Sequence, residues 1–525
     1  MYERDFLMSG KLMSRRRALR AGVTAGSGLF VMSLLAACGG GGITAAAPTT
    51  AATTAPAAAK PTTAATTGAA AVPTTAATTG AAVAPTTAAT TSAAAAPTAA
   101  ATTGTTGAAT APAATRPPTV VKGTKVTFWY NYTGNNEKAM NSIMDKFNAS
   151  QSQYTIVGES KKTYDDLFKA NLAAIQAGDP AGFSIAYENQ VAEFQKSNVI
   201  IPFDDFINNA QGGLTAEDKA DIFAPFLELG KFSQFGNKQL TFPAGKSLEL
   251  MWYNADMIKA AGFDKPADTW DEFKTQCAKL TSGDVVGYVV KPDASRFATW
   301  VFSRGGDLIT PDGSKITLNT PEGQASMQLI ADLNKNKQMK MTGPTGFDDE
   351  NIWAASKAAY WQDSSSGRGF IDAAIKQQKG NPFNWQAVPP PQGSPANKHA
   401  SNLYGGNFTV FKTKPEQQTG AWQFIKFFAQ KENTVAWALA TGYMPLRKSA
   451  ADTPEFKKFL DENPHNGVAF NNLGNPNKAE PKIAAWQQTR DILQAAIQDV
   501  INNGASVNDA LAAADKKANA AMQQS

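Results

Sequence analysis

From Lys125 onward the sequence alternates short β-type runs with amphipathic helical segments, and this alternation restricts the fold more than any other feature. Residues 125–130, 154–157 and 183–187 have the length and the apolar, aromatic content of strands. Helix-type segments at 135–150 and 164–177 separate them. Strands joined through helices need right-handed crossovers and form a parallel sheet. The sequence therefore predicts an α/β fold.

The stretch 240–254 divides this α/β region. Residues 242–245, Phe-Pro-Ala-Gly, break one element because proline has no N–H donor and glycine tolerates unusual φ angles. Residues 248–253 then form a run of strand length, and Asn254 is placed to cap a helix over 255–261. A break, a buried strand and a helix in mid-chain indicate that the chain passes here from one lobe into another.

The N-terminal region is not expected to join that fold. A Ser-Arg-Arg-Arg sequence at 14–17 matches a twin-arginine pattern, a weakly apolar stretch follows, and Leu-Ala-Ala-Cys at 35–38 resembles a lipoprotein processing box. We therefore expect residues 1–37 to be a twin-arginine-type lipoprotein signal peptide and Cys38 to carry the lipid. A transmembrane anchor is the alternative, but the apolar run is short and glycine-rich for a span of roughly 20 residues.

The lipidated cysteine begins a linker, 38–118, of glycine and then alanine, threonine and proline with almost no charge. Such a composition buries too little apolar surface to offset the entropy of ordering, so it predicts a disordered tether. A flexible coil of this length would span about 50 Å, which is enough to hold a domain off a membrane or through a wall layer. Whether its threonines are glycosylated is left open.

Charge and the rare side chains exclude several classes of function. The net charge is +5, but residues 1–37 hold six cations and two anions, so the remainder is close to +1 and does not argue for nucleic acid. Cys277 has only Cys38 as a possible partner, so we expect no internal disulfide and a small, buried, apolar role for Cys277. His399 and His465 lie far apart in the sequence, and no metal site or cofactor is predicted.

Several short segments, by their order and spacing, resemble the family 1 extracellular solute-binding proteins of ABC importers, and most of all its sn-glycerol-3-phosphate-binding members. The segments are Lys-Thr-Tyr-Asp-Asp-Leu at 162–167, Ala-Ala-Ile-Gln-Ala-Gly-Asp-Pro at 173–180, Ala-Tyr-Glu at 186–188, Met-Trp-Tyr-Asn at 251–254, Thr-Trp at 269–270, Ser-Ser-Ser-Gly at 364–367, Gly-Gly at 405–406 and Thr-Gly-Tyr-Met-Pro at 441–445. The resemblance covers most of residues 119–525. It implies a two-lobe periplasmic-binding-protein-like fold (type II), with several hinge crossings around a ligand cleft. Lobe one would comprise 119–244 plus 407–443, and lobe two 248–402 plus 446–525.

The same resemblance implies a set of ligand-binding residues. The set is Tyr164, Glu188, Ser247, Trp300, Ser365 or Ser366, Gly405 or Gly406, Tyr443 and Arg490. Arg490 would offer a planar fork to phosphate oxygens, and Glu188 would accept hydrogen bonds from hydroxyl groups. Aromatic rings would lie against the C–H faces of the ligand.

Three further residues are candidates for the site. The pattern departs from the family where Ala-Gly-Lys-Ser at 244–247 replaces an Asn-Ser-Ser-Thr stretch, which places Lys246 near the hinge and the ligand. Tyr130 and Tyr132 follow a predicted strand, and ligands of open α/β sheets bind beyond the carboxyl ends of strands. The tryptophans at 353, 361, 385, 422 and 437 are expected in the core instead.

Together these inferences predict a monomeric, lipid-anchored binding protein on the outer face of the cell membrane. It would capture a carbohydrate or glycerol-phosphate-type solute by lobe closure and deliver it to an ABC permease, without catalysis. A neutral mono- or oligosaccharide is the alternative to a phosphate ester. Two rivals belong to other classes: an exported glycoside hydrolase, which needs paired carboxylates such as Glu188 and Asp363, and a wall-associated binding module, which the linker would suit equally.

Overall fold

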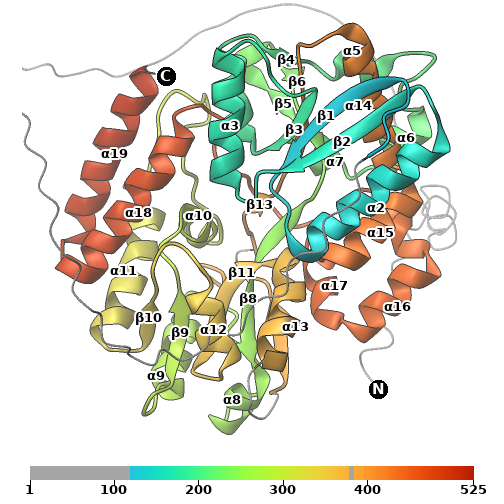
Figure 1. Ribbon diagram of the computed structural model, residues 1–525. Coiled ribbons are helices and arrows are strands. Elements are labelled where there is room, and N and C mark those ends of the chain that lie inside the picture. The colour runs from blue at the N-terminus through green and yellow to red at the C-terminus, as the bar shows by residue number, and fades with distance from the viewer. Residues whose placement is uncertain (1–118, 378–382, 397, 525) are drawn as a thin grey trace, which may run out of the picture. The chain divides into compact units, whose positions relative to one another are not determined.

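The computed structural model describes residues 119–377, 383–396 and 398–524, which build two main β-sheets, each with helices packed around it (Figure 1). The predicted signal peptide, Cys38 and the linker lie outside the described residues. Sheet one has the strand order β2-β1-β3-β14-β4, with β7 paired to β14. Its strands are β1 (Thr124–Tyr130), β2 (Tyr154–Ser160), β3 (Phe183–Ala186), β4 (Ile200–Ile201), β7 (Phe242–Pro243) and β14 (Asn407–Phe411).

The parallel arrangement predicted from the alternation is confirmed for β1, β2 and β3. Strand β14 runs antiparallel to β3, because it enters sheet one from the other sheet instead of through a helical crossover. Helices around sheet one are α2 (Gly134–Ser150), α3 (Tyr164–Gln176), α4 (Glu188–Gln195), α5 (Asp204–Asn208), α6 (Ala216–Asp221), α7 (Ala224–Glu228), α14 (Pro415–Phe428) and α15 (Lys431–Thr441). Near α7, a short ladder pairs β5 (Lys231–Phe232) with β6 (Lys238–Gln239), joined by η1 (Ser233–Phe235).

Sheet two has the order β10-β9-β11-β8-β12, with β13 also paired to β8. Its strands are β8 (Ser247–Asn254), β9 (Val286–Val290), β10 (Met339–Met341), β11 (Ala358–Ser364), β12 (Trp385–Val388) and β13 (Leu403–Tyr404). The remaining helices are α8 (Ala255–Ala260), α9 (Trp270–Leu280), α10 (Ala294–Phe302), α11 (Pro321–Lys335), α12 (Asp348–Ala354), η2 (Ser365–Gly367), α13 (Arg368–Gln377), η3 (Lys448–Asp452), α16 (Pro454–Glu462), α17 (Pro464–Asn471), α18 (Trp486–Asn503) and α19 (Val507–Gln524). We refer to sheet one with the helices around it as lobe one, and to sheet two with α8–α13, α18 and α19 as lobe two; η3 and α16 pack against α15 of lobe one.

Local signals that the sequence offers for helix starts are present in the structure. The Asn254 side chain accepts a hydrogen bond from Met257 N and caps α8, as predicted. Thr269 and Glu272 form a capping box at the start of α9. Cys277 on α9 is fully buried, as expected for a small apolar residue. These short-range interactions fix where elements begin, independently of the packing around them.

The two glycines at 405–406 make the return crossing between the sheets. They separate two strands that pair differently: β13 pairs with β8 in sheet two, whereas β14 belongs to sheet one. The chain turns at Gly405, whose φ of +133° favours glycine, and a Cβ there would lie 2.0 Å from the carbonyl oxygen of Gly245. The backbones of the outgoing and returning crossings are therefore in contact, and a side chain at Gly405 would push them apart.

Strand β8 leaves this junction and runs into sheet two (Figure 1). Leu248, Leu250 and Trp252 on β8 belong to the same apolar cluster as Phe128 and Phe408 of sheet one. Apolar packing thus continues through the crossing instead of stopping at it. Trp353, Trp361, Trp422 and Trp437 are buried in this cluster as predicted, and Trp385 is partly buried against it.

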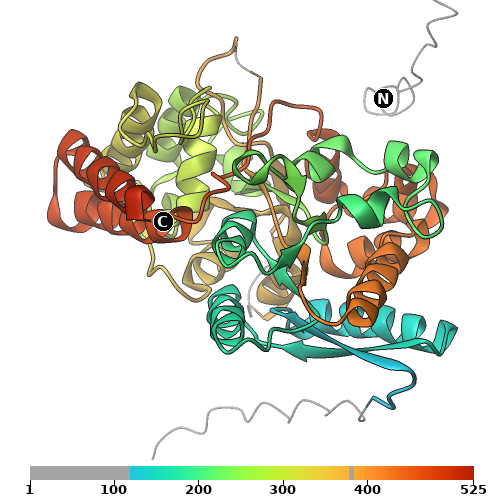
Figure 2. The ribbon, with the colours of Figure 1, turned by 90° about the horizontal axis from the view of Figure 1, so that it is seen from above.

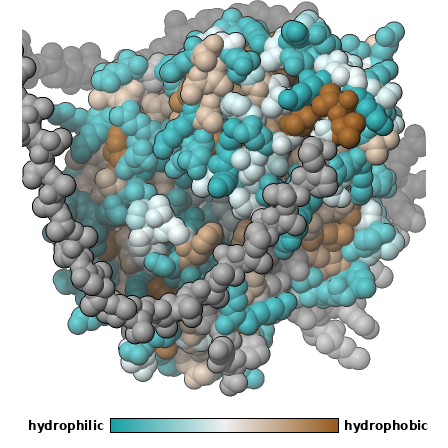
Figure 3. Space-filling view, in the orientation of Figure 1, coloured by the Kyte–Doolittle hydropathy of each residue, from teal (hydrophilic) through white to brown (hydrophobic). Residues whose placement is uncertain are grey.

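The C-terminal helices α18 and α19 lie side by side in both ribbon views (Figures 1 and 2). On the face shown in Figure 3, hydrophilic side chains predominate and apolar ones gather in small separate areas. Among the described residues, no helix combines the length and apolar character needed to cross a membrane.

Candidate functional site

Most of the predicted site residues lie where the chain crosses between the sheets. Ala244 N and Gly245 N both donate hydrogen bonds to the carbonyl oxygen of Gly406, at 3.2 and 3.1 Å. Met444 N donates to the Lys246 carbonyl at 2.9 Å, so the last crossing lies beside the first. Gly245 must be small as well, because a Cβ there would lie 3.0 Å from the Tyr443 ring.

Four tyrosines from different elements gather beside these crossings. Tyr132 follows β1, Tyr164 begins α3, Tyr187 precedes α4, and Tyr443 lies at the last crossing. The Tyr164 and Tyr187 rings stack with centroids 4.1 Å apart, and Tyr443 stacks on Trp437 at 5.8 Å. Burial raises the pKa of all four phenols above the usual value, so each stays a neutral hydroxyl that can donate a hydrogen bond.

Two of these hydroxyl groups point at Gly406. A Cβ on Gly406 would lie 2.9 Å from the Tyr164 hydroxyl and 3.5 Å from that of Tyr132. Both hydroxyls are buried; that of Tyr132 has no hydrogen-bond partner among the described residues, whereas that of Tyr164 interacts with the hydroxyls of Tyr187 and Tyr443. A buried donor without a partner costs about 1–3 kcal/mol, so such groups are retained where something else, such as a ligand, engages them.

Glu188 and Lys246 form a buried ion pair. Lys246 Nζ donates to Glu188 Oε1 at 2.8 Å, and the lysine side chain is completely buried. The same ammonium lies 3.4 Å from the Gly405 carbonyl oxygen. Lys246 therefore ties the start of α4 to both the outgoing and the returning crossing. Lys246, which departs from the family pattern, thus places a positive charge beside Glu188.

The predicted serines take part in the same junction. Ser365 Oγ accepts a hydrogen bond from Leu248 N at 3.2 Å, and Ser247 Oγ donates to the Tyr404 carbonyl at 3.4 Å. Ser366 Oγ lies 2.8 Å from Ser364 Oγ. Of the predicted serines, Ser365 thus holds the first residues of β8, while Ser366 is bonded within its own turn.

Arg490 on α18 is engaged by two carboxylates. It donates through Nη1 to Glu480 and to Ser295 Oγ at 3.1 Å, and through Nη2 to Asp293 at 3.4 Å. Burial lowers the pKa of this guanidinium, but the two carboxylates outweigh that effect and raise it above the usual value. In turn, burial tends to raise the pKa of Asp293, while the two arginines Arg490 and Arg296 hold it at about 2. The sequence analysis missed Glu480, because the irregular loop before α18 gives no periodic signal.

A cavity of about 20 Å³ lies between the lobes at this point. It is lined by Tyr187, Glu188, Asn189, Ser295, Leu403, Tyr404, Ala479, Glu480, Pro481 and Arg490. Such a volume holds about one water molecule, far less than the several hundred Å³ of an ordinary ligand pocket. The lobes also touch directly, because Asn189 Nδ2 donates to Gln487 Oε1 at 3.1 Å. Side chains thus fill most of the space between the lobes at this point.

Trp300 and Tyr130 lie apart from the cavity. Trp300 is fully buried in the apolar cluster of sheet two, where its Nε1 donates to Gln362 at 2.6 Å. The Tyr130 hydroxyl donates to Asn141 at 3.3 Å, and only its ring reaches Tyr132 at 5.9 Å. Ligand contact by any residue of the predicted set stays a prediction.

Comparison with known proteins decides the family. The profile described as "Bacterial extracellular solute-binding protein" matches residues 142–467. The chain belongs to this family. The sn-glycerol-3-phosphate-binding periplasmic protein UgpB of Escherichia coli K12 is 26% identical over 426 residues, covering 76% of this chain and 93% of that protein. UgpB of Shigella dysenteriae is 25% identical over 419 residues with the same coverage.

Solved structures confirm the type II two-lobe fold of this solute-binding protein. UgpB from Mycobacterium tuberculosis, in complex with glycerophosphocholine, has a TM-score of 0.66 at 20% identity and covers 76% of this chain and 98% of that one. The cyclic α-maltosyl-1,6-maltose binding protein from Arthrobacter globiformis has a TM-score of 0.64 at 22% identity and covers 77% and 100%. At these identities the likeness establishes the fold alone.

Beneath the cavity, the solute-binding protein holds a second charged cluster that the sequence did not indicate. Arg296 on α10 donates to Asp363 at 2.7 Å and lies 3.6 Å from Glu249 on β8. The Tyr404 hydroxyl donates to Glu249 at 2.6 Å. Burial raises the pKa of Glu249 to about 7, although Arg296 opposes the shift. The carboxylates proposed for a hydrolase, Glu188 and Asp363, are thus each paired with a different cation.

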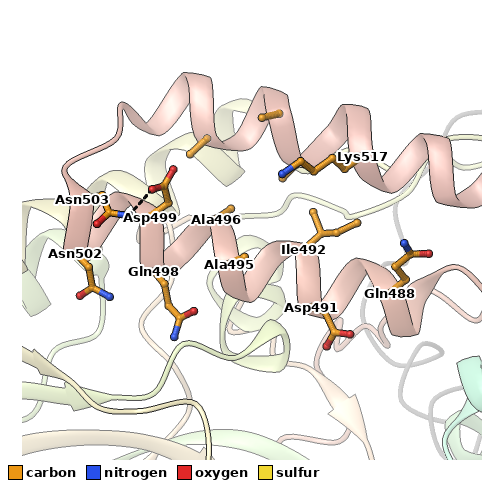
Figure 4. Close-up of a pocket in the computed structure, with 13 residues that line it drawn as sticks. Gln488, Asp491, Ile492, Ala495, Ala496, Gln498, Asp499, Asn502, Asn503 and Lys517 are labelled. Carbon is orange, nitrogen blue, oxygen red and sulfur yellow. Dashed lines mark hydrogen bonds between the residues drawn. The ribbon is translucent and has the colours of Figure 1, made fainter. Parts of the chain in front are cut away.

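A larger groove of about 850 Å³ lies elsewhere, along α18 and α19 of the solute-binding protein (Figure 4). Asp491, Gln498 and Asn502 point away from α19, and Lys517 extends from α19 itself. None of the predicted ligand residues lines it. Its lining is mostly polar side chains and alanines from two surface helices.

Proposed function

We propose that this chain is the substrate-binding protein of an ABC importer and captures a carbohydrate or glycerol-phosphate-type solute between its lobes. Family membership supports solute binding, and the named relatives bind sn-glycerol 3-phosphate, glycerophosphocholine or maltosaccharides. The observation that carries the placement of the site is the buried hydroxyl of Tyr132 beside Gly406, which has no hydrogen-bond partner among the described residues. It is a donor that the described part of the protein leaves unused.

In this mechanism, binding is coupled to closure. Contacts between the lobes include Lys482, which precedes α18 and whose ammonium donates to the carbonyl of Lys231 in lobe one at 2.5 Å. Gln234 of lobe one donates back to the Lys482 carbonyl at 2.6 Å. Opening would release these contacts and admit a ligand, and closure would restore them while excluding water from the ligand. No covalent step is needed, because the hydroxyls and carboxylates of the cleft only exchange hydrogen bonds.

The ligand would occupy the place of the small cavity, of whose lining only Glu188 and Arg490 belong to the predicted set, and would extend from there to the hydroxyls beside Gly406. Glu188 and the tyrosine hydroxyls would bond to ligand hydroxyls, and the rings would cover apolar ligand faces. Glu480 joins the predicted set, because it lines the cavity together with Arg490. Ser247 and Ser365 would act mainly by holding β8 in place, given the backbone groups that they contact.

We further propose that the protein is exported and anchored through a lipid on Cys38, with residues 39–118 as a tether and an ABC permease as its membrane partner. The extracellular solute-binding family supports export. The processing box at 35–38 supports the anchor. Metabolic labelling with a radioactive fatty acid tests it: the wild type should incorporate label and Cys38→Ala should not.

A thermal-shift panel on the purified full-length chain tests solute binding. The panel contains sn-glycerol 3-phosphate, glycerophosphocholine, glycerol, maltose and maltotriose. A compound present at 100 times its dissociation constant should stabilise the fold by about 2.7 kcal/mol. Hydrolysis of any of these compounds by the purified chain, seen by chromatography, would instead favour the glycoside hydrolase or another enzyme.

A further inference from the structure

The arginine that would bind a phosphate group has both of its terminal nitrogens engaged by groups of the protein. Its Nη1 donates to Glu480 and Ser295, and its Nη2 faces Asp293. A phosphate ester recruits arginine by offering oxygens to this same planar fork. In this chain, carboxylates of the protein already fill those positions.

Glu480 cannot easily move aside for a phosphate group. Its Oε1 accepts from Ser295 Oγ at 2.6 Å and from Asn402 Nδ2 at 2.9 Å. Its Oε2 accepts from Trp486 Nε1 at 2.6 Å and from Arg490. A rotation that freed Arg490 would leave several buried donors without partners. The negative charge is therefore fixed beside the cavity that it lines.

The other cations near the cavity are engaged as well. Lys246 is paired with Glu188, and Arg296 with Asp363 and Glu249. The Lys482 ammonium is surrounded by the carbonyl oxygens of residues 228, 229 and 231. An anionic ligand would therefore lose its hydration shell and gain no unpaired positive charge in exchange. It would also lie against the carboxylate of Glu480.

We propose that Glu480, with Asp293, determines specificity by neutralising Arg490, so that the cleft selects an uncharged polyhydroxylated solute and rejects phosphate esters. This inference rests on the proposed function, because it assumes that the ligand lies between the lobes. The uncharged ligand would receive hydrogen bonds from Tyr132 and Tyr164 and donate its own hydroxyls to Glu188. Arg490, Glu480 and Asp293 would offer the ligand fixed hydrogen-bond donors and acceptors, and their charges would balance one another instead of a charge on the ligand.

Isothermal titration calorimetry on the full-length chain tests the proposal, with sn-glycerol 3-phosphate, glycerol, maltose and maltotriose as probes. In the wild type, sn-glycerol 3-phosphate should bind at least tenfold more weakly than the best neutral probe. Glu480→Gln removes the fixed charge with little change in shape, and should tighten binding of sn-glycerol 3-phosphate at least fivefold. Asp293→Asn should act in the same direction. Glu462→Gln is the matched control, because Glu462 is exposed on α16, and it should change neither affinity.

Circular dichroism and the unfolding midpoint identify variants that fold. The proposal is overturned if the wild type binds sn-glycerol 3-phosphate more tightly than every neutral probe. It is also overturned if both variants fold and neither gains affinity for the phosphate ester. A failure of the proposed function gives a different result, because no probe would then bind the wild type. In that case, binding of sn-glycerol 3-phosphate by the folded variants would support the specificity proposal, and no binding by them would overturn it.

Discussion

Lys246 Nζ lies 2.8 Å from Glu188 Oε1, and this ion pair joins the first crossing between the sheets to the start of α4. Because the lysine is fully buried, neither charge is well solvated without the other. Lys246, which the sequence analysis named as a candidate ligand contact because it departs from the family pattern, is therefore part of the framework around Glu188.

Breaking this pair should destabilise the protein strongly. Lys246→Met leaves a buried carboxylate without its partner, and the free energy of unfolding should fall by about 3–5 kcal/mol. Urea denaturation measures it. Lys458→Met, which removes a pair exposed on α16, should change stability by less than about 1 kcal/mol. Equal effects of the two substitutions would contradict the structural role given to Lys246.

A side chain at the return crossing should disturb the hinge. Gly405→Ala combines a φ of +133° with a Cβ 2.0 Å from the Gly245 carbonyl oxygen, so the two crossings must separate. We expect a loss of at least about 3 kcal/mol in unfolding free energy and weaker ligand binding. Gly178→Ala also has positive φ, but its Cβ would meet nothing within 4 Å, so a loss of about 1 kcal/mol is expected. Similar losses at both glycines would argue against contact between the crossings.

Removing an unused hydroxyl should affect stability and binding in opposite directions. Tyr132→Phe deletes a buried hydroxyl without a partner among the described residues, so the free protein should be as stable as the wild type or more stable by about 1 kcal/mol. Ligand affinity should fall severalfold, because a donor is lost. Tyr360→Phe removes a hydroxyl that accepts from Ala267 N, so it should lower stability and leave affinity unchanged. Calorimetric titration and thermal unfolding of both variants separate the two patterns.

The Lys482 contact should favour the closed state. Lys482→Met removes the donor to the Lys231 carbonyl, and the lobes should open more often in the absence of ligand. Small-angle X-ray scattering should then show a larger radius of gyration for the free variant than for the free wild type. Lys259→Met, on α8 with an exposed side chain, serves as the control and should leave the radius unchanged. An unchanged radius for Lys482→Met would show that this contact does not hold the lobes together.

Stability should decrease as the pH rises toward neutrality. The folded-state pKa of Glu249 is about 7, above the value of 4.5 for an unperturbed glutamate, so the folded chain binds this proton more tightly than the unfolded chain does. Its contribution is complete below pH 4.5 and is lost as the pH rises through about 7, with a limit of about 3 kcal/mol. Urea denaturation from pH 4.5 to 8 measures the slope. Glu249→Gln should reduce this slope and Glu462→Gln should not; the remainder comes from Glu350, whose pKa burial also raises to about 7.

Much of the local structure follows from the sequence. The face of α2 that carries Met140 and Met144, the cap at Asn254 and the capping box at Thr269 all depend on residues within a few positions of one another. Such interactions do not depend on tertiary contacts, so periodicity and capping rules predict them. The division of residues 403–411 into two strands is not of this kind, because β13 and β14 are separated by pairing with different sheets, which no local pattern specifies.

By itself, the sequence determined an α/β chain that crosses between lobes near Gly245 and carries cations and carboxylates suited to a polar ligand. Only the tertiary structure decided which of those charges remain available. Asp293 lies 197 positions from Arg490, and Glu188 lies 58 from Lys246, so no local pattern specifies these pairs. Their distances depend on the packing of both sheets and the closure of the lobes, and charge–charge energies depend steeply on that distance and on burial.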